Sequence, residues 1–440
     1  MRVIVIGGGA VGLCVAESLA SRGAQVTVFE RDRCGSAASA GNAGWITPSL
    51  SIPVPAPGVI ATSLRWLVNP SGPLWIRPTL SPPMLDWIAR FIGSCSRSAY
   101  QAGLTVLQHA AARAGPAFDR LIARGIRFEL HDDPLLYPAF SQVELEHLWH
   151  VVQELLEAGT RQPLERLSAA QARELEPALD GSLAGAVIAH GERRVRPERL
   201  TAELRRALIA RGVEVVERSP VTALVRDRSR WRVDAEAQSR AGEAVVIAGG
   251  VDSLRLLAPL GVRLPVVAAK GYSRTYAADP SGPRRPLYLE APKVAISVFD
   301  GGVRVSGTLE LGARDLSLSS RRLDAIAAAA QRALPRWHMP PAPHDWAGLR
   351  SLSPDGLPFV GPLPGLDGIH VATAHATLGI TLAPLTGELV ATQLLDGQAD
   401  ELLAAFDPRR ALQRGSHRRS EPRLALQDRE ASRQQPQEDS

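Results

Sequence analysis

The N-terminal stretch constrains the fold of this 440-residue chain more than any other part of the sequence. It begins with an apolar run at positions 3–6, which is typical of a parallel strand that is covered on both faces. Gly7, Gly9 and Gly12 follow in the pattern G-x-G-x-x-G, where this strand must turn into a helix. In such a turn the first glycine permits the tight bend, the second leaves room for a pyrophosphate, and the third lets the helix pack closely. Residues 25–29 are then expected to form a second strand.

An acidic residue ends this unit at a position that suits a nucleotide. Glu30 lies 18 residues beyond Gly12, where a carboxylate can accept hydrogen bonds from both hydroxyls of an adenosine ribose. An acid here disfavours a 2′-phosphate and therefore NADP, whereas FAD and NAD both remain open. The stretch predicts a dinucleotide at the helix N-terminus, where free N–H groups and the positive dipole end lie. The residues expected to contact it are Gly7, Gly9, Ala10, Val11, Gly12, Glu30 and Arg31.

Length and charge narrow the class of protein. A chain of 440 residues is too long for one ordinary core, so two intertwined domains are expected. The formal net charge is +5, and nearly all of the basic residues are arginine. Because no basic stripe with interleaved aromatic residues is present, nucleic-acid binding is not expected.

Cysteine usage and hydropathy predict a cytoplasmic protein. Cys14, Cys34 and Cys95 form no C-x-x-C pair and leave an odd cysteine, as is typical of a reduced compartment. The first strand begins at residue 2, which leaves no room for a secretory signal. No apolar run reaches the length of about 18 residues that a membrane-spanning helix needs.

A loop of small residues follows the predicted ribose-binding acid. Residues 31–49 are rich in Ser, Gly, Asn and Ala and have neither helical nor strand period, which would also describe an ordinary surface loop. In this position, however, so many backbone N–H groups suit an extended ligand. The loop therefore favours a dinucleotide longer than the near half of NAD.

The middle of the chain predicts helices and a strand that returns to the first domain. Residues 83–125 have helical period, and residues 168–176 begin with an S-x-x-Q capping box. Residues 197–211 form a further predicted helix, with proline in its first turn. Residues 244–248 are an apolar run that leads into Gly249, as expected of a strand that returns beside the first one.

The last third of the chain predicts the second domain and the end of the first. Strands and turns alternate over residues 263–311, with a hairpin turn at 300–302, and indicate an antiparallel sheet. Residues 368–372 are expected to be the final buried strand and residues 386–395 the final helix. Beyond residue 406 the chain is polar and has no apolar period, so disorder is expected.

Five collinear blocks carry a resemblance that covers roughly residues 1–405. They are ASAGNAG at 38–44, KGYS at 270–273, RVSGTLE at 304–310, WAGLR followed by SPDGLP within 346–358, and HATLGIT at 375–381. These blocks resemble those of the amine-oxidising FAD family that includes D-amino-acid dehydrogenase, glycine oxidase and sarcosine oxidase, and the dehydrogenase branch is the most similar.

Several residues depart from the family pattern. Two alanines replace the glycines on either side of the histidine, an isoleucine replaces a tryptophan, a serine replaces a proline, and a tryptophan stands where a smaller or polar residue is usual. These residues are, in the same order, Ala374, Ala376, Ile380, Ser351 and Trp45. All of them would lie near the flavin, so the departures bear on the identity of the substrate.

The resemblance implies a fold that combines α/β and α+β parts. A Rossmann-like FAD-binding domain is expected over 1–50, 180–265 and 346–405. A discontinuous substrate or helical domain, built on an antiparallel sheet, is expected over 51–179 and 266–345. The remaining residues, 406–440, are expected to be a disordered tail.

FAD is the cofactor that the resemblance implies, and we expect it to be bound non-covalently. Covalent attachment through cysteine is known in the sarcosine branch, but no cysteine lies beyond Cys95. Besides the N-terminal unit, the residues expected to contact FAD are Ser39, Asn42, Ala43, Gly44, Trp45, Val221, Gly249, Gly379, Ile380 and Thr381.

The chemistry implied by the resemblance requires a carboxylate clamp. Arg350 is the candidate, because a guanidinium fork holds a carboxylate through two parallel hydrogen bonds and keeps its charge. The equivalent arginine of the family has this role, and an ion pair with Asp355 or another acid is the alternative. Tyr288 lies on an expected strand where the glycine-oxidase branch places a carboxylate-binding tyrosine. It would otherwise pack in the core with its hydroxyl hydrogen-bonded.

His375 is the third catalytic candidate, and it precedes the final helix. It could touch the flavin or the substrate amine and, with an ordinary pKa of about 6.5, carry protons. The alternative is a buried histidine that is bonded to the backbone, and no side-chain base is needed if the amine loses its proton to water. Residues 378–381 are expected at the N-terminus of the final helix, where N–H groups and the helix dipole would stabilise the reduced flavin.

The leading interpretation is an enzyme that deaminates a D-amino acid, or a D-proline- or hydroxyproline-like imino acid, by hydride transfer from the α-carbon to flavin N5. The product would be an imino acid and then a 2-oxo acid. The resemblance implies that electrons pass to a quinone or another respiratory carrier, with at most peripheral association at the inner membrane. The alternatives are a glycine- or sarcosine-type oxidase that uses O2, an FAD-dependent 2-hydroxy-acid dehydrogenase, and a non-catalytic flavin-binding subunit.

Overall fold

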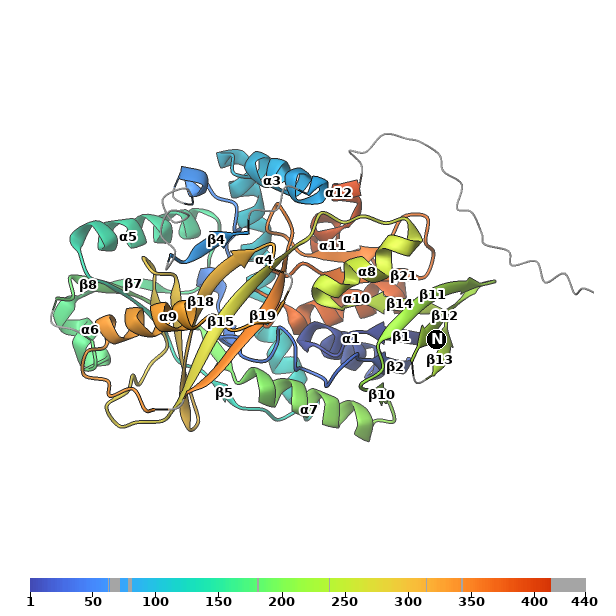
Figure 1. The fold of residues 1–440 in the computed structure, drawn as a ribbon, viewed down its shortest axis with the longest axis horizontal. Helices are drawn as coiled ribbons and strands as arrows, with labels where there is room; N and C mark the ends of the chain where they lie inside the picture. Colours follow the sequence, from blue (N-terminus) through green and yellow to red (C-terminus); the bar gives the residue numbers. More distant parts are fainter. Residues whose placement is uncertain are drawn as a thin grey trace, which may run out of the picture.

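The computed structural model describes residues 1–61, 63, 72–77, 81–179, 182–236, 238–313, 315–341 and 343–412. These residues form two lobes, each of which is built on its own large sheet (Figure 1). The chain passes between the lobes repeatedly, so neither lobe is continuous in sequence.

The first lobe contains a six-stranded sheet in which five neighbouring strands are parallel and the last is antiparallel. Its central strand is buried at residues 3–6, because strands flank it on both sides and helices cover both faces of the sheet. In spatial order the strands are β10 (Glu214–Val216), β2 (Gln25–Phe29), β1 (Arg2–Ile6), β14 (Ala244–Ile247), β21 (Ile369–Thr373) and β20 (Phe359–Pro362).

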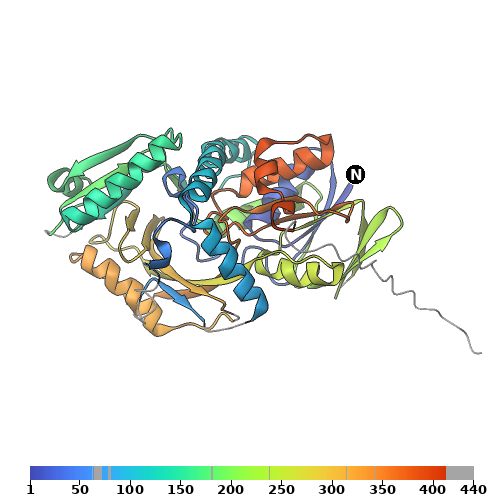
Figure 2. The same ribbon diagram turned by 90° about the horizontal axis from the view of Figure 1, so that it is seen from above.

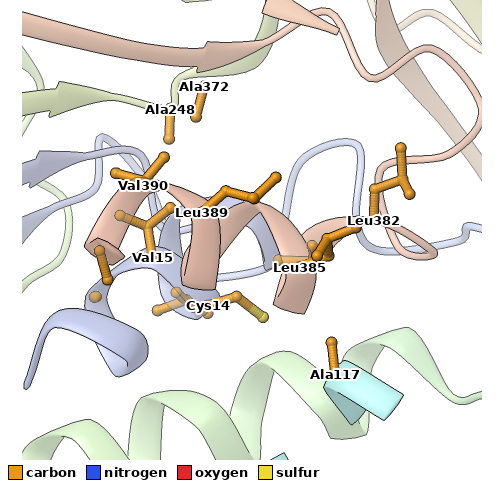
Figure 3. Close-up of a cluster of buried hydrophobic side chains, with 14 of the residues drawn as sticks. Cys14, Val15, Ala117, Ala248, Ala372, Leu382, Leu385, Leu389 and Val390 are labelled. Atoms are coloured by element: carbon orange, nitrogen blue, oxygen red, sulfur yellow. The ribbon is translucent and has the colours of Figure 1, made fainter. Parts of the chain in front are cut away.

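Four helices enclose the main core of this lobe. They are α1 (Ala10–Ala20), α4 (Arg97–Ala123), α7 (Pro197–Ala210) and α10 (Ala383–Asp396). Figure 3 shows Cys14 of α1 near Leu385 and Leu389 of α10, with Ala117 of α4 on the opposite side. The two central helices cross closely, since a Cβ at Gly387 would lie 2.4 Å from the carbonyl oxygen of Cys14. A larger residue at that crossing would push α10 away from α1.

The second lobe contains a nine-stranded sheet that is mostly antiparallel. Helix α9 (Ser320–Ala333) covers one of its faces and α5 (Gln142–Glu157) lies on the other (Figure 2). In spatial order the strands are β19 (His344–Leu352), β15 (Val267–Ala277), β18 (Gly302–Leu311), β17 (Val294–Phe299), β16 (Leu287–Leu289), β6 (Leu135–Ala139), β8 (Gly185–Ala189) and β7 (Leu164–Ser168), with β4 (Leu74–Ile76) paired to β18.

Side-chain alternation on two neighbouring strands separates the faces of this sheet. On β6, Leu136 packs in the cluster beneath α9, whereas Tyr137 packs in the cluster beneath α5. On β16, Leu287 and Tyr288 divide in the same way. Because successive side chains of a strand point to opposite faces, the two tyrosines share the face on the α5 side.

Smaller elements complete the two lobes. One three-stranded sheet contains β3 (Trp45–Ile46), β9 (Arg193–Val195) and β5 (Leu130–His131), and another contains β11 (Val221–Asp227), β12 (Arg230–Ala235) and β13 (Ser239–Gly242). Further helices and short helical turns are α3 (Pro82–Ser94), α6 (Ala169–Leu175), α8 (Ser253–Leu257), α11 (Glu401–Phe406), α12 (Arg409–Leu412), η1 (Pro48–Leu50), η2 (Gly250–Asp252) and η3 (Ala258–Leu260). Among the described helices, none is long and apolar enough to cross a membrane.

The local predictions hold with one exception among the long helices. The capping box of α6 is present, because Ser168 accepts a hydrogen bond from the N–H of Gln171 and the Gln171 side chain accepts one from the N–H of Ser168. The helical stretch predicted at 83–125 is two helices. The side chain of Ser96 accepts a hydrogen bond from the N–H of Ala99 and thereby begins α4 as a separate helix.

The lobes differ from the expected domain boundaries at their edges. Strands β8 and β19 belong to the second sheet, although the sequence assigns their residues to the FAD-binding domain. Helix α4 packs into the core of the first lobe rather than the substrate domain. The disorder expected from residue 406 onward does not hold for 406–412, where Arg410 of α12 pairs with Asp355 at 2.8 Å. Residues 413–440 lie outside the described residues.

Candidate active site

Two of the three fingerprint glycines are required by the fold itself. Gly7 has a φ of +112°, and a Cβ at this position would lie 2.5 Å from the carbonyl oxygen of Ala248. A Cβ at Gly12 would lie 1.9 Å from the carbonyl oxygen of Gly7. Both positions therefore need glycine whether or not a ligand is bound.

Gly9 differs from the other two glycines. Its φ is −73°, and apart from its chain neighbours only the Ser39 Oγ would lie within 4 Å of a Cβ, at 3.4 Å. Neither the backbone conformation nor the packing requires glycine there. The space in front of Gly9 lies at the N-terminus of α1, beside Ala10 and Val11, and it fits the approach of a dinucleotide phosphate.

Glu30 follows β2 and turns its carboxylate back towards the glycine turn. The carboxylate accepts hydrogen bonds from the N–H of Gly8 at 2.6 Å and from the N–H of Asp32 at 2.9 Å. Only 9% of Glu30 is exposed. The acid is thus held at the end of the strand beside the first turn of α1, where the sequence predicts the ribose.

Three further predicted contacts lie in the same lobe. Arg31 pairs with Asp252 at 2.6 Å. Val221 begins β11 and is buried in the cluster that contains Phe29 of β2. Gly249 follows β14 and borders the glycine turn.

The loop of small residues runs from the N-terminus of α1 towards that of α10. At one end the Ser39 Oγ accepts a hydrogen bond from the N–H of Ala10 at 3.0 Å. At the other end the Thr381 hydroxyl donates to the carbonyl oxygen of Trp45 at 2.8 Å. An extended ligand lying along this loop would therefore meet both helix N-termini.

The middle of the loop is fastened to the second sheet. Asn42 Oδ1 accepts a hydrogen bond from the N–H of Gly44 at 2.8 Å, which closes a tight turn. The carbonyl oxygen of Ala43 accepts a hydrogen bond from the hydroxyl of Ser297 on β17, also at 2.8 Å. Asn42, Ala43 and Trp45 border the large cavity described below.

A partly buried ion pair that the sequence predictions do not include also holds this loop. Arg304 of β18 is 3% exposed, pairs with Glu198 at 2.6 Å and donates to the carbonyl oxygen of Asn42 at 2.7 Å. Glu198 in turn accepts a hydrogen bond from the N–H of Gly41 at 3.4 Å. Burial lowers the pKa of Arg304, and Glu198 opposes that shift. The only sequence signal for this role is that Arg304 begins the RVSGTLE block.

The turn before α10 presents backbone N–H groups towards the lobe interface. Gly379, Ile380 and Thr381 lie in the turn that precedes Ala383, the first residue of α10, and none of their N–H groups donates a hydrogen bond to a described residue. Free N–H groups at a helix N-terminus stabilise negative charge. The arrangement fits a cofactor on which negative charge develops during reduction.

A cavity of about 1630 Å³ lies between the lobes, next to these elements. Much of its wall is apolar, as Trp87, Leu309 and Leu352 illustrate. Thr381 and Leu378 contribute to it from the first lobe, and strands β6, β16, β18 and β19 contribute from the second.

Arg350 is a partly buried cation in the wall of this cavity. Its guanidinium lies over Gly271 of the neighbouring strand β15, where a Cβ would come within 2.5 Å of the Cζ atom. Its Nη1 donates to the carbonyl oxygen of Thr308 at 3.2 Å, and Thr308 has a φ of +67°, which is strained for a β-branched residue. Asp355, the expected alternative partner, pairs with Arg410 instead.

No carboxylate among the described residues pairs with Arg350. Burial lowers the pKa of its guanidinium, and Tyr288 opposes this shift. A buried charge is costly unless a partner neutralises it. The cavity therefore fits a ligand that brings a carboxylate.

Tyr288 lies beside this guanidinium in the cavity wall. Its ring meets those of Trp45 and Tyr137 edge to face, with centroids 5.9 Å apart in both pairs. Its hydroxyl makes no hydrogen bond to a described residue, so the core-packing alternative with a bonded hydroxyl does not hold. Burial raises the pKa of Tyr288, which keeps the hydroxyl a donor.

The structure does not bring His375 to the cavity wall. The side chain is 6% exposed, and its Nε2 lies 3.0 Å from the Thr386 hydroxyl of α10. Burial lowers the pKa of His375 to about 4, so the imidazole is neutral near pH 7. The residue lies between β21 and α10, and the bonding partner of its ring is a side chain rather than the expected backbone.

The site combines a glycine turn, a buried acid after β2, free N–H groups before α10, and a cavity whose guanidinium has no carboxylate partner among the described residues. This combination fits a dinucleotide-binding oxidoreductase. The chain belongs to a family with that chemistry. Residues 2–393 match the model of the family of FAD dependent oxidoreductases abbreviated DAO, so FAD is the cofactor.

Relatives cover nearly the whole chain. A protein named D-amino acid dehydrogenase from Xanthobacter autotrophicus is 32% identical, and the match covers 91% of this chain and 97% of the relative. A protein of the same name from Vibrio vulnificus is 29% identical over 92% of this chain and 99% of the relative.

Solved structures agree with the fold. Glycine oxidase from Geobacillus kaustophilus superposes with a TM-score of 0.74 at 25% identity, covering 92% of this chain and 98% of that one. L-proline dehydrogenase from P. horikoshii superposes with a TM-score of 0.69 at 17% identity and covers 93% and 97% of the two chains.

Proposed function

We propose that this protein is an FAD-dependent dehydrogenase of a D-amino acid or of a related cyclic imino acid. The observation that carries the proposal is the guanidinium of Arg350, which lines a largely apolar cavity and has no carboxylate partner among the described residues. The relatives named D-amino acid dehydrogenase support the D configuration and the dehydrogenase class.

Arg350 and Tyr288 would bind the carboxylate of the substrate. The guanidinium fork offers two parallel hydrogen bonds, and the unbonded Tyr288 hydroxyl can donate a third. Fixing the carboxylate orients the α-carbon and the amine, and such orientation lowers a barrier by roughly several kcal/mol. The apolar wall around them would lower the local dielectric and strengthen the ion pair.

The bound FAD would supply the hydride acceptor. The protein must present the amine in its neutral form, because only then does the nitrogen lone pair assist the loss of hydride from the α-carbon. The product would be an imino acid, which water hydrolyses to a 2-oxo acid unless the imine is cyclic.

We infer that FAD is bound without a covalent bond to cysteine. Among the described residues no cysteine lines the cavity. Cys14 is buried between α1 and α10, and burial together with Glu217 raises the pKa of Cys34 to about 12, which keeps the thiol unreactive.

We further propose that a quinone or another respiratory carrier accepts the electrons. The name dehydrogenase, which the relatives bear, favours an acceptor other than oxygen. To reach such a carrier, the protein would need at most a peripheral association with a membrane.

The test is anaerobic bleaching of the flavin by a panel of D-amino acids, L-amino acids, proline derivatives, glycine, sarcosine and 2-hydroxy acids. We expect a D-amino acid or a D-proline derivative to bleach it fastest. Arg350→Ala and Arg350→Lys should retain FAD but lose roughly 2–5 kcal/mol of transition-state binding, because lysine restores the charge without the planar fork.

Arg274→Lys is the matched control for these variants. Arg274 lies on β15 in the same sheet, but it pairs with Asp345 at 2.7 Å and does not line the cavity.

Bleaching that persists undiminished in Arg350→Ala would remove Arg350 from the site. Reduction by 2-hydroxy acids alone, or rapid stoichiometric release of hydrogen peroxide in air, would favour the corresponding alternative enzyme. A flavin that no panel member bleaches would favour a non-catalytic subunit.

A further inference from the structure

Glu192 is a buried acid between β8 and β9 that the carboxylate clamp does not use. The side chain is 1% exposed. Its Oε1 accepts a hydrogen bond from the N–H of Ser49 at 3.0 Å, whereas its Oε2 is buried without a partner among the described residues. An unpartnered buried carboxyl oxygen costs free energy, and such a group is therefore a candidate for a function.

Ser49 and Tyr137 connect this acid to the cavity. Ser49 lines the cavity, and its hydroxyl oxygen lies 2.7 Å from the hydroxyl oxygen of Tyr137. Tyr137 lines the cavity beside Tyr288, on the face of the sheet that these two rings share. Two hydrogen-bonded hydroxyl groups therefore lead from the cavity wall beside Tyr288 to Ser49, whose N–H and hydroxyl group both act on Glu192.

The turn that carries Ser49 is held in place from α4. The side-chain amide of Gln108 donates to the carbonyl oxygens of Pro48 and Ser51, at 3.1 and 3.0 Å. The hydroxyl of Thr160 bonds to the remaining amide oxygen of Gln108. The path is therefore built on a fixed segment rather than on a free loop.

No cation among the described residues pairs with Glu192. The adjacent Arg193 and Arg194 pair with Asp119 and Asp133, each at 2.6 Å. The other ionisable groups near the path are Tyr137, Tyr288, Glu290, Arg350 and His190, the last of which lies 3.3 Å from Glu165. Burial raises the pKa of Glu192 to about 8, and the hydrogen bonds from Ser49 offset part of that rise. The acid thus exchanges its proton close to neutral pH, where a general base works best.

We propose that Glu192 accepts the proton that the substrate's ammonium group must lose, through Tyr137 and Ser49. The ammonium N–H bond breaks and its proton passes to the Tyr137 oxygen, while the Tyr137 proton passes to Ser49 and the Ser49 hydroxyl proton to the Glu192 carboxylate. The amine and Glu192 become neutral, and both hydroxyl groups are unchanged. The neutral amine then supports the loss of hydride to the bound FAD, which leaves a protonated imine.

This inference rests on the proposed function, because it requires an amine substrate. The experiment measures the limiting rate of anaerobic flavin reduction between pH 6 and 10. In the wild type the rate should rise with an apparent pKa of about 8, as Glu192 loses its proton. Glu192→Gln should lose that ionisation, and its rate at pH 8.5 should fall by roughly 100-fold. The amide oxygen of glutamine can still accept the Ser49 N–H, so the structural contact is preserved.

Ser49→Ala and Tyr137→Phe keep the acid but interrupt the path, and they should lower the rate in the same way. Ser51→Ala is the matched control. Its hydroxyl is buried in the same turn, donates to the carbonyl oxygen of Thr47 at 3.0 Å, and does not line the cavity. Benzoate, a carboxylate without an amine, should bind the wild type and all four variants with the same Kd.

A second measurement needs no turnover. Infrared titration of the oxidised protein without substrate should show a protonated carboxyl band that disappears near pH 8, is absent in Glu192→Gln and persists in Ser49→Ala. A wild-type pH profile retained in Glu192→Gln, or a carboxyl group already ionised at pH 6, would overturn the proton path alone. A wild-type flavin that no amine reduces would overturn the proposed function, and the proton path with it.

Discussion

The dinucleotide end of the site is built mainly from the backbone, whereas the substrate end is built from side chains. At the dinucleotide end, Gly7 and Gly12 leave so little space that a Cβ would lie 2.5 Å or less from a backbone oxygen. At the substrate end, Arg350 and Tyr288 project from strands β19 and β16, which three other strands separate within the sheet. The first end depends on short-range geometry, and the second depends on strand register.

The two ends should therefore respond differently to mutation, in folding stability and in ligand binding. The glycine turn serves the fold and the ligand with the same atoms, so most changes there should affect both. The cavity wall holds a cation that has no carboxylate partner among the described residues, so we expect a change there to weaken binding while the protein stays folded.

The largest expected effect distinguishes two glycines of the same turn. Gly12→Ala places its Cβ 1.9 Å from the carbonyl oxygen of Gly7 and should destabilise the apoprotein by about 3 kcal/mol or more. Gly9→Ala has free space, so it should leave the apoprotein's stability within about 0.5 kcal/mol of the wild type and weaken FAD binding alone. Thermal unfolding of the apoproteins and FAD titration would measure the two effects.

Gly115→Ala is the control for these variants, because a Cβ at this position in α4 meets no atom within 4 Å. It should stabilise the helix slightly. Equal loss of apoprotein stability in Gly9→Ala and Gly12→Ala would contradict the view that only one of them faces a ligand.

The sequence predicts the dinucleotide end well because its parts are close together along the chain. The strand, the glycine turn and Glu30 are local, and their spacing alone indicates a parallel strand, a helix and a ribose-binding acid. The family resemblance adds Arg350, which lines the cavity. The boundaries of the lobes are less predictable, because β8 and β19 join the second sheet through pairings between residues that are far apart in sequence.

The side-chain contacts that the sequence did not predict also depend on pairing between distant parts of the chain. Ser49, Tyr137 and Glu192 are separated by long stretches of chain, and only the pairing of β6 and the position of the turn 48–51 bring them together. The contact of His375 with Thr386 on α10 was likewise not expected from the sequence. No single-sequence pattern encodes such a contact between two elements.

A medium effect should test whether the substrate end depends on the position of Arg350. A Cβ at Gly271 would lie 2.5 Å from the guanidinium carbon of Arg350. Because the arginine side chain is flexible, it can move away from that contact. Gly271→Ala should therefore raise the Kd of the carboxylate ligand benzoate about 10-fold, or about 1.4 kcal/mol, with FAD affinity unchanged. Titrations with benzoate and with FAD would separate the two. A change in FAD affinity with no change for benzoate would place Gly271 at the wrong end of the site.

The smallest expected effect concerns the segment between the two ends. Ala374 and Ala376 have φ values of +61° and +50°, where the related family has glycine, and Ser351 holds both through hydrogen bonds from their N–H groups at 3.1 and 2.9 Å. The left-handed conformation costs alanine about 1–2 kcal/mol, whereas glycine makes the unfolded chain more flexible by about 0.4–1 kcal/mol. Ala376→Gly should therefore stabilise the protein by about 0.5–1 kcal/mol. Ala374→Gly should be close to neutral, because it also removes a fully buried methyl group worth about 0.8 kcal/mol. Chemical denaturation of the apoproteins would measure the free energy of unfolding of both variants.

Equal destabilisation by both variants would show that the segment between β21 and α10 is not strained. Its alanines would then be held by packing alone.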